Sequence, residues 1–390
     1  MQKIFAGRAI IDCQEQASVT LTVESGLITG ISESSRPGDA DVVLEDGILI
    51  PGLIDLQVNG YQGVNFSHAD ENEWRRAAHC LPETGVTAFA AAFVTASIQD
   101  LAESLRHCNA AMNTPPRGGQ ARLLGAHLEG PFLSPAHPGA HDVTLFCDPE
   151  PARIRPLLDA ALAGTLAIIT LAPERTFALE AIKQFVSAGT LVCLGHTDAT
   201  ADQTMAAIDA GARCVTHLYN AQRPFHHRDP GIIGQSLTDP RISFSLVLDD
   251  HHLSHQAAAM AFGLAADRLV LVTDAVAAAG MPPGQYQLGG RTIHTAPNRP
   301  PTSADGAFAG STLRLDHALA NAVRLGLPLP EAVAAATTRP AELLARHDLG
   351  RIEVGARADL VWLDQHLTTN ATWVGGELVF SKSLIRKDGP

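Results

Sequence analysis

The 390-residue sequence has no long apolar segment and comparatively few positive charges. Its longest apolar runs are too short to span a bilayer, and residues 1–8 contain no apolar stretch of the kind that marks a signal peptide. Lys and Arg number 28 against 41 Asp and Glu, which gives a formal net charge of −13. This balance argues against general affinity for nucleic acid or membrane surfaces. An anionic small ligand stays compatible with it, because such a ligand needs only a local basic pocket.

Cysteine pairs with the spacing of a metal or redox site are also missing. The six cysteines are scattered without a Cys-x-x-Cys pair, and several lie within apolar segments. Disulfides persist in oxidising compartments, whereas buried thiols are typical of reducing ones. The pattern predicts reduced thiols in the core of a cytoplasmic protein.

From about residue 48 onward, apolar runs of strand length alternate with helix-like stretches. Eight such runs lie at residues 53–58, 86–93, 123–128, 166–171, 191–194, 213–216, 242–248 and 269–273. Helix-like stretches lie at 71–83, 98–112, 151–163, 177–188, 199–210 and 255–264. Buried strands that alternate with helices form a parallel sheet, and eight of them close a barrel. A doubly wound open sheet is the alternative, but residues 59–63 do not fit the glycine-rich loop that it requires.

Both ends of the chain have a different, β-rich pattern. Apolar and polar residues alternate within residues 1–50, and strand-like runs return at 360–363 and 377–380. The N-terminal part is too small to be stable alone, so we expect both ends to pair into one small sheet domain. The expected division is a small domain of residues 1–50 and 350–390 beside a barrel of residues 51–349.

Four residues that can bind metal or move protons follow four of the predicted strands. They are Glu129, His196, His217 and Asp274, after the third, fifth, sixth and eighth runs. Barrel active sites lie at the carboxyl ends of the strands, so these side chains should share one mouth. One glutamate and two histidines form a catalytic zinc-type ligand set, in which the ion lowers the pKa of water to about 7. Asp274 would take the proton from that water and deliver it to a leaving amine.

Several motifs resemble those of the amidohydrolase superfamily. Residues 51–60, Pro-Gly-Leu-Ile-Asp-Leu-Gln-Val-Asn-Gly, are similar to its first-strand signature, in which a His-x-His pair usually binds metal. Gln57 and Asn59 replace that pair here, and neutral amides are poor zinc ligands, so they would form at most a vestigial second metal site. The N-acetylglucosamine-6-phosphate deacetylase family shares this departure. The chain also resembles that family in His-Leu-Glu-Gly-Pro-Phe at 127–132, Gly-His-Thr at 195–197, Thr-His-Leu-Tyr-Asn-Ala at 216–221 and Thr-Asp-Ala at 273–275.

The resemblance implies an α/β fold, a (β/α)8 TIM barrel with a small β-sandwich formed by the N- and C-terminal segments. It implies hydrolysis of the N-acetyl group of N-acetylglucosamine 6-phosphate to glucosamine 6-phosphate and acetate. One divalent ion per subunit would be held by Glu129, His196 and His217, with Asp274 as general base and then acid. Zinc fits this ligand set, and Fe²⁺, Mn²⁺ and Co²⁺ also accept two imidazoles and a carboxylate.

The same resemblance assigns substrate contacts. His141 would polarise the acetamide carbonyl as negative charge builds on its oxygen. The other substrate-binding residues that it implies are Ala140, Asn220, Ala221, His252, Phe308, Ala309 and Gly310. Arg228 is implied to bind the phosphate in the neighbouring subunit's site, which implies a homodimer. Arginine suits that role because its planar guanidinium matches a phosphate with two hydrogen bonds.

Three other functions stay open. The same chemistry on the galactosamine epimer differs by one hydroxyl orientation, and the residues that read it cannot be identified from the sequence. A cyclic-amide hydrolase or deaminase on this barrel would need a His-x-His pair or a carboxylated lysine, and residues 166–171 contain no lysine. A non-catalytic scaffold would have lost the metal ligands, which are all present.

Overall fold

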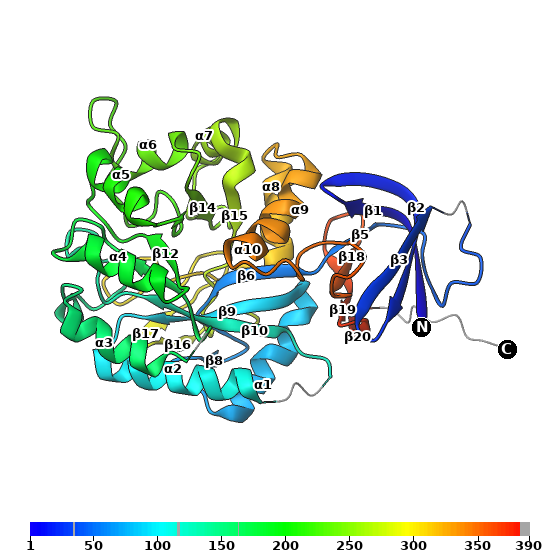
Figure 1. The fold of residues 1–390 in the computed structure, drawn as a ribbon, viewed down its shortest axis with the longest axis horizontal. Coiled ribbons are helices and arrows are strands. Elements are labelled where there is room, and N and C mark those ends of the chain that lie inside the picture. The colour runs from blue at the N-terminus through cyan, green and yellow to red at the C-terminus, as the bar shows by residue number, and fades with distance from the viewer. Residues whose placement is uncertain (34–35, 115–117, 163, 383–390) are drawn as a thin grey trace.

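The computed structural model describes residues 1–33, 36–114, 118–162 and 164–382, and a sheet of eight parallel strands forms its larger part (Figure 1). These strands are β6 (Leu53–Val58), β9 (Val86–Val94), β10 (Arg122–Glu129), β11 (Leu166–Leu171), β12 (Leu191–Leu194), β13 (Cys214–Val215), β14 (Ser243–Leu246) and β15 (Leu269–Leu271). They neighbour one another in chain order, as repeated strand–helix units do. Nearly all of their residues are buried, which explains why the runs are continuously apolar rather than alternating.

The first and last strands of this sheet meet at a seam. Val58 and Ala275 form a parallel bridge across the seam, and the backbone N–H of Asn59 donates to the carbonyl of Ala275 at 2.7 Å. The seam lies between β6 and β15, which are the two ends of the strand order. The predicted eight-stranded barrel is thereby confirmed.

Helices lie outside the barrel strands (Figure 1). They are α1 (Glu71–Cys80), α2 (Ile98–Asn113), α3 (Pro151–Ala160), α4 (Ala178–Ser187), α5 (Ala201–Ala210), α6 (Gly231–Thr238), α7 (His255–Ala265), α8 (Leu315–Arg324), α9 (Leu329–Ala336) and α10 (Thr338–Leu343). The sequence pattern does not predict α6, which begins after Pro230 and contains Gly231 and Gly234. It forms because Ile232 and Ile233 are buried against the barrel core, and this tertiary contact outweighs the low helix propensity of glycine.

The two ends of the chain form one further eight-stranded sheet. Its strands are β1 (Gln2–Ile11), β2 (Gln14–Glu24), β3 (Leu27–Glu33), β4 (Val42–Leu44), β5 (Ile48–Pro51), β18 (Leu360–Leu363), β19 (Thr369–Val374) and β20 (Glu377–Ser381). The antiparallel pairing of β5 with β18 joins the N-terminal strands to the C-terminal ones. The expected small β domain from both ends is therefore present beside the barrel (Figure 1). The division at residues 50 and 350 stays a prediction.

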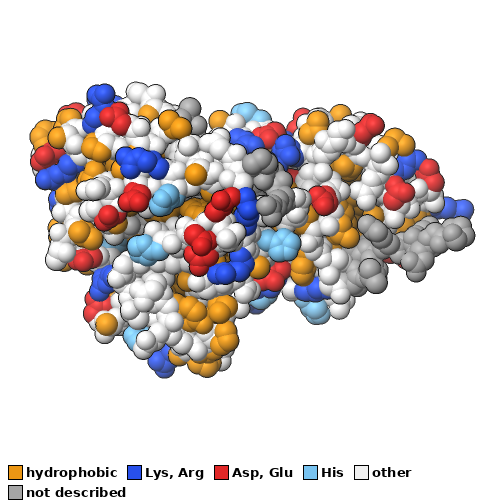
Figure 2. All heavy atoms as spheres, turned by 90° about the horizontal axis from the view of Figure 1, so that it is seen from below, with side chains coloured by type: hydrophobic (Ala, Val, Ile, Leu, Met, Phe, Trp, Pro, Cys, Tyr) orange, Lys and Arg blue, Asp and Glu red, His pale blue; other side chains and the backbone are white. Residues whose placement is uncertain are grey.

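Short hairpins and mixed surface charge complete the molecule. The proline- and glycine-rich stretch after β15 carries the hairpin of β16 (Gln285–Leu288) and β17 (Arg291–His294), and β7 (Gly60–Tyr61) pairs with β8 (Val64–Asn65) after β6. The face in Figure 2 shows acidic and basic side chains interspersed rather than separated into large patches. None of the helices in the described ranges has both the length and the apolar character that crossing a membrane requires.

Candidate active site

The polar residues that follow the barrel strands lie together at one end of the barrel. Glu129 is the last residue of β10, His196 and His217 follow β12 and β13, and Asp274 follows β15. His196, His217 and Asp274 have positive φ angles of 46°, 33° and 51°. Such backbone costs a non-glycine residue about 1–3 kcal/mol and is concentrated at functional sites. The strain therefore marks this end of the barrel as the candidate site.

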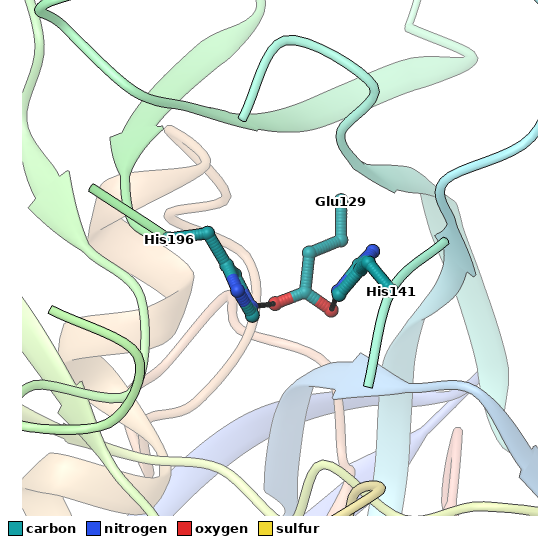
Figure 3. Close-up of side chains that lie close together, drawn as sticks. All are labelled: Glu129, His141 and His196. Carbon is teal, nitrogen blue, oxygen red and sulfur yellow. Dashed lines mark ion pairs between the residues drawn. The ribbon is translucent and has the colours of Figure 1, made fainter. Parts of the chain in front are cut away.

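One carboxylate lies between the imidazoles (Figure 3). Nε2 of His196 lies 3.3 Å from Oε1 of Glu129. Nε2 of His217 lies 2.8 Å from the same oxygen. On the other side, Nε2 of His141 lies 3.8 Å from Oε2. All four side chains are buried, and a buried carboxylate is costly unless a cation or several donors surround it. Glu129 therefore needs a positive partner, either a proton on imidazole or a metal ion.

The hydrogen bonds of His196 favour a metal ion. Its Nδ1 lies 3.1 Å from the backbone carbonyl of His137. Because a carbonyl oxygen only accepts, Nδ1 carries the proton, and Nε2 of the neutral ring presents a lone pair. That lone pair faces the Glu129 carboxylate at 3.3 Å, and two acceptors at this distance are suited to a shared cation. The residues present therefore fit a divalent metal.

His217 binds the same carboxylate and lacks a second partner. Its Nδ1 is buried and has no hydrogen-bond partner among the residues that the structure describes. Burial lowers the pKa of His217, but the hydrogen bond and charge of Glu129 outweigh burial and raise the pKa above its ordinary value. Burial raises the pKa of Glu129, while the adjacent imidazoles of His196 and His217 hold it well below its ordinary value. Glu129 is therefore anionic and suited to be a ligand.

The ring of His141 carries its proton on the other nitrogen. The backbone N–H of Thr95 donates to Nδ1 of His141 at 3.3 Å, and the Thr95 hydroxyl lies 2.9 Å from the same atom. Because a backbone N–H only donates, Nδ1 holds a lone pair and Nε2 carries the proton. Burial and the neighbouring imidazole of His196 lower the pKa of His141 to about 3, so the ring is neutral. His141 therefore presents an N–H donor, although its ligand atom lies within 4.8 Å of those of Glu129 and His196.

Asp274 reaches the site from the last barrel strand. Its Oδ1 accepts hydrogen bonds from Nε2 of Gln57 at 3.1 Å and from Nδ2 of Asn59 at 2.7 Å. Burial and the negative charge of Glu129 raise the pKa of Asp274 to about 7. A carboxyl group with such a pKa can accept and return a proton near neutral pH. The amide nitrogens of Gln57 and Asn59 are thus directed to Asp274. The vestigial second metal site at these two residues stays a prediction.

The loop after the β16–β17 hairpin passes close to Asp274. Gly310 has a φ of 66°, and a Cβ at this position would lie 2.6 Å from the carbonyl oxygen of Asp274. Glycine is required there, because both the left-handed backbone and the close approach exclude a side chain. The backbone N–H of Ser311 then donates to the same carbonyl at 2.8 Å, which helps to fix the strained turn at Asp274.

These groups line a cavity of about 500 Å³ at the mouth of the barrel. Of the predicted residues, its lining includes Asn59, Glu129, Ala140, His141, His196, His217, Asn220, Ala221, His252, Asp274, Phe308 and Gly310. Ala309 instead packs in an adjoining apolar cluster, and Arg228 lies on an exposed loop outside the cavity. The volume suits one small metabolite.

At the rim of the cavity, a carboxylate orients His252. Nδ1 of His252 lies 2.8 Å from Oδ2 of Asp249, and Oδ1 of Asp249 accepts the backbone N–H groups of His251 and His252, each at 2.9 Å. Burial raises the pKa of Asp249. The hydrogen bond and charge of His252 together with the backbone N–H groups of His251 and His252 outweigh burial, so the pKa lies below its ordinary value. The anionic Asp249 therefore fixes the orientation of the His252 ring, which lines the cavity.

Two ion pairs of Arg223 anchor the loop that carries Arg228. The guanidinium of Arg223 pairs with Asp229 on the same loop, and with Asp198 at 3.2 Å on the loop after β12. The backbone N–H of Arg228 donates to Nδ1 of His226 at 3.3 Å, and its guanidinium lies 3.1 Å from Nε2 of His227, the one partner of that group among the side chains that the structure describes. Its guanidinium therefore remains available to a ligand or another subunit.

Three residues that support the site were not among those predicted from the sequence. Thr95 and Asp249 hold His141 and His252, and Arg291 in β17 donates to the carbonyls of Ala140 and His141 at 2.7 and 3.1 Å. Only Asp249 carries a local hint, because it lies three residues before His252. The others come from distant segments and meet the site only in the folded chain.

The chain is similar to a family model, to curated proteins and to solved structures that agree with one another. Residues 48–379 match the model of the amidohydrolase family. An N-acetylglucosamine-6-phosphate deacetylase from Vibrio furnissii is 36% identical over 370 residues, which cover 94% of this chain and 92% of that relative. An N-acetylgalactosamine-6-phosphate deacetylase from Escherichia coli O157:H7 is 36% identical over 363 residues, covering 92% and 94%. The structure of N-acetyl-D-glucosamine-6-phosphate deacetylase from Mycobacterium smegmatis superposes with a TM-score of 0.92 at 35% identity, covering 97% of this chain and 100% of that one.

Proposed function

The chain belongs to the amidohydrolase family, and from that premise we propose that it hydrolyses the N-acetyl group of N-acetylglucosamine 6-phosphate. The products are glucosamine 6-phosphate and acetate. The observation that carries the proposal is the meeting of His196 and His217 on one oxygen of Glu129, inside a cavity that Asp274 also lines. The relatives from Vibrio furnissii and Mycobacterium smegmatis bear the name of this reaction.

Glu129, His196 and His217 would hold one divalent ion per subunit, for which zinc fits the ligand set and iron, manganese or cobalt are further candidates. Such an ion, when bound, supplies Lewis acidity that polarises a carbonyl and lowers the pKa of water. The hydrogen bond from His196 to the carbonyl of His137 fixes the ring with its Nε2 lone pair toward the site. This bond therefore prepares the ligand before any ion arrives.

Asp274 moves the proton during the reaction. It accepts a proton from water as the new C–O bond forms, and returns it to the amide nitrogen as the C–N bond breaks. Gln57 and Asn59 both donate to Oδ1 of Asp274, so the other oxygen, Oδ2, is left to handle the proton. One proton of the water therefore ends on the amine, which departs neutral, and the oxygen with the other proton ends in acetic acid, which ionises to acetate.

His141 and the groups at the rim bind the substrate. The N–H at Nε2 of His141 would donate a hydrogen bond to the amide oxygen as negative charge builds there. At the far end, Asn220, the backbone of Ala221 and His252 would contact the sugar phosphate. Phe308 lies with its ring centroid 5.2 Å from that of His252, and together with Ala309 and Gly310 it would form the surface against the sugar.

Arg228 would complete the phosphate site of the neighbouring subunit in a homodimer. We expect Arg228→Ala to raise KM for the phosphorylated sugar by about 10-fold or more, because a charge-assisted hydrogen bond contributes about 1.5–3 kcal/mol. Metal content should not change. The activity on unphosphorylated N-acetylglucosamine should stay at the wild-type level, and Arg155→Ala on α3 is the matched exposed control. Steady-state kinetics on both substrates would contradict the phosphate role if KM did not move.

Acetate release tests the proposed function directly. The zinc-loaded enzyme is given N-acetylglucosamine 6-phosphate, N-acetylgalactosamine 6-phosphate and unphosphorylated N-acetylglucosamine in parallel. Fast turnover of the glucosamine phosphate alone supports the proposal. Preference for the galacto epimer would keep the mechanism and change the substrate, an alternative that the 36% identical Escherichia coli relative favours. No release from any of them by metal-bound protein would contradict the proposal.

A further inference from the structure

A second aspartate, Asp55, is buried at the barrel seam and takes no part in the mechanism described above. It lies in β6, only 1% exposed, on the strand that also carries Gln57. No arginine, lysine or histidine among the described residues pairs with it, since its hydrogen bonds come from neutral donors. A buried carboxylate without a cationic partner is expensive to keep, so its contacts indicate what it does.

All hydrogen bonds to Asp55 come from the immediate surroundings of Asp274. Oδ1 of Asp55 accepts the backbone N–H groups of Thr273 and Gln57, each at 3.2 Å. Oδ2 accepts the hydroxyl of Thr273 at 2.6 Å. Thr273 directly precedes Asp274 in the chain, and the side chain of Gln57 donates to Asp274. Asp55 thus binds the residue that precedes Asp274 and the backbone of Gln57, one of the two residues whose side chains donate to the Asp274 carboxylate.

The seam explains why a side chain is needed here. The other seven strand junctions of the barrel have ladder pairing, but β6 and β15 do not pair as strands, and the bridge between Val58 and Ala275 lies beyond the end of β15. The N–H of Thr273 therefore lacks a strand carbonyl as its acceptor, although a buried N–H must be satisfied. The carboxylate of Asp55 replaces that carbonyl.

The hydroxyl of Thr273 connects Asp55 to the backbone turn at Asp274. It donates to Asp55 and accepts the backbone N–H of Ala275 at 3.1 Å. Asp274 lies between these two anchored residues with its φ at 51°, a conformation that a non-glycine residue keeps only when its surroundings impose it. From the other side, Ser311 fixes the carbonyls of Thr273 and Asp274.

We propose that Asp55 is a positioning residue. It holds the strained turn of Asp274, and the backbone of Gln57 whose side chain donates to Asp274, in the geometry that proton transfer requires. The inference rests on the proposed function, because it assigns Asp274 the proton transfer. It predicts an effect on the chemical step rather than on substrate binding. A displacement of about 1 Å in a reacting group can cost about 100-fold in rate.

The test compares Asp55→Ala with Asp55→Asn in the zinc-loaded enzyme. The alanine variant leaves the N–H groups of Thr273 and Gln57 without an acceptor, and we expect kcat to fall about 100-fold with KM within about twofold of wild type. Asparagine keeps one oxygen for both N–H groups and should restore at least about 10-fold of that loss. Metal content should match wild type in both variants.

Coupling to Asp274 separates positioning from general stability. In an Asp274→Ala background the turn no longer carries a proton acceptor, so adding Asp55→Ala should change the residual kcat by less than about twofold. Asp359→Ala is the matched control, because this carboxylate is 2% exposed and accepts the N–H of Gly375 at 2.6 Å in the small β domain. It should lower Tm while kcat and KM stay unchanged.

Two outcomes would overturn the inference. One is a kcat of Asp55→Ala within about threefold of wild type, and the other is an equal loss in the presence and absence of Asp274. If Asp55→Ala does not fold, Thr273→Val decides instead, because it removes only the hydroxyl contact and should lower kcat without raising KM. Wild-type enzyme is assayed alongside: no acetate release from wild type refutes the proposed function, whereas active wild type with unaffected variants refutes the inference alone.

Discussion

Asp274→Asn is expected to keep its metal and to lower kcat by about 1,000-fold or more, because general acid–base catalysis contributes about 10²–10⁴-fold and this residue acts in both directions. Asparagine has the shape of aspartate and can keep its oxygen toward the amides of Gln57 and Asn59. It cannot accept the proton of water. The fold and the ligands Glu129 and His196 should therefore be preserved while the chemistry stops.

Kinetics and metal analysis on the same preparation check this result. The matched control is Asp202→Asn, which makes the same substitution at an exposed position in the first turn of α5. Its kcat should equal that of wild type. A near-normal kcat in Asp274→Asn would remove Asp274 from the mechanism, and loss of metal from that variant would instead make it a ligand.

Glu129→Gln is expected to lose both metal and activity. The uncharged amide removes the anion that His196 and His217 face at 3.3 and 2.8 Å. Even partners outside the ligand shell change metal affinity by about 10–100-fold, so replacing a ligand should weaken binding by at least about 100-fold. Activity should fall with metal content, and added zinc in excess should restore part of it.

Zinc titration with metal analysis measures this loss, and Glu180→Gln on the exposed face of α4 serves as control. Full metal occupancy in Glu129→Gln would contradict the ligand role of Glu129. Taken together, the two substitutions separate binding from proton transfer, because only Glu129→Gln should respond to added zinc.

Residues at the ends of strands could be predicted because the chain itself marks them. Glu129 directly follows a continuous apolar run and His196 follows one after a single glycine, and the carboxyl ends of parallel strands must converge in a barrel. Eight such runs suffice to predict the closed sheet. The similar β pattern of both termini predicts that they pair. It does not mark β1 and β19 as separate strands, although both are present in the structure.

The supports of the site could not be predicted, because they arise where distant segments meet. Asp274 and Gln57 are 217 positions apart, and His141 and Thr95 are 46 apart. A hydrogen bond between such residues leaves no local periodicity, so neither the tautomer of His141 nor the seam contact of Asp55 can be read along the chain. The sequence by itself determined the barrel and the reactive side chains at its strand ends. Only the tertiary structure decided how those side chains are oriented, because orientation depends on hydrogen bonds across the closed barrel.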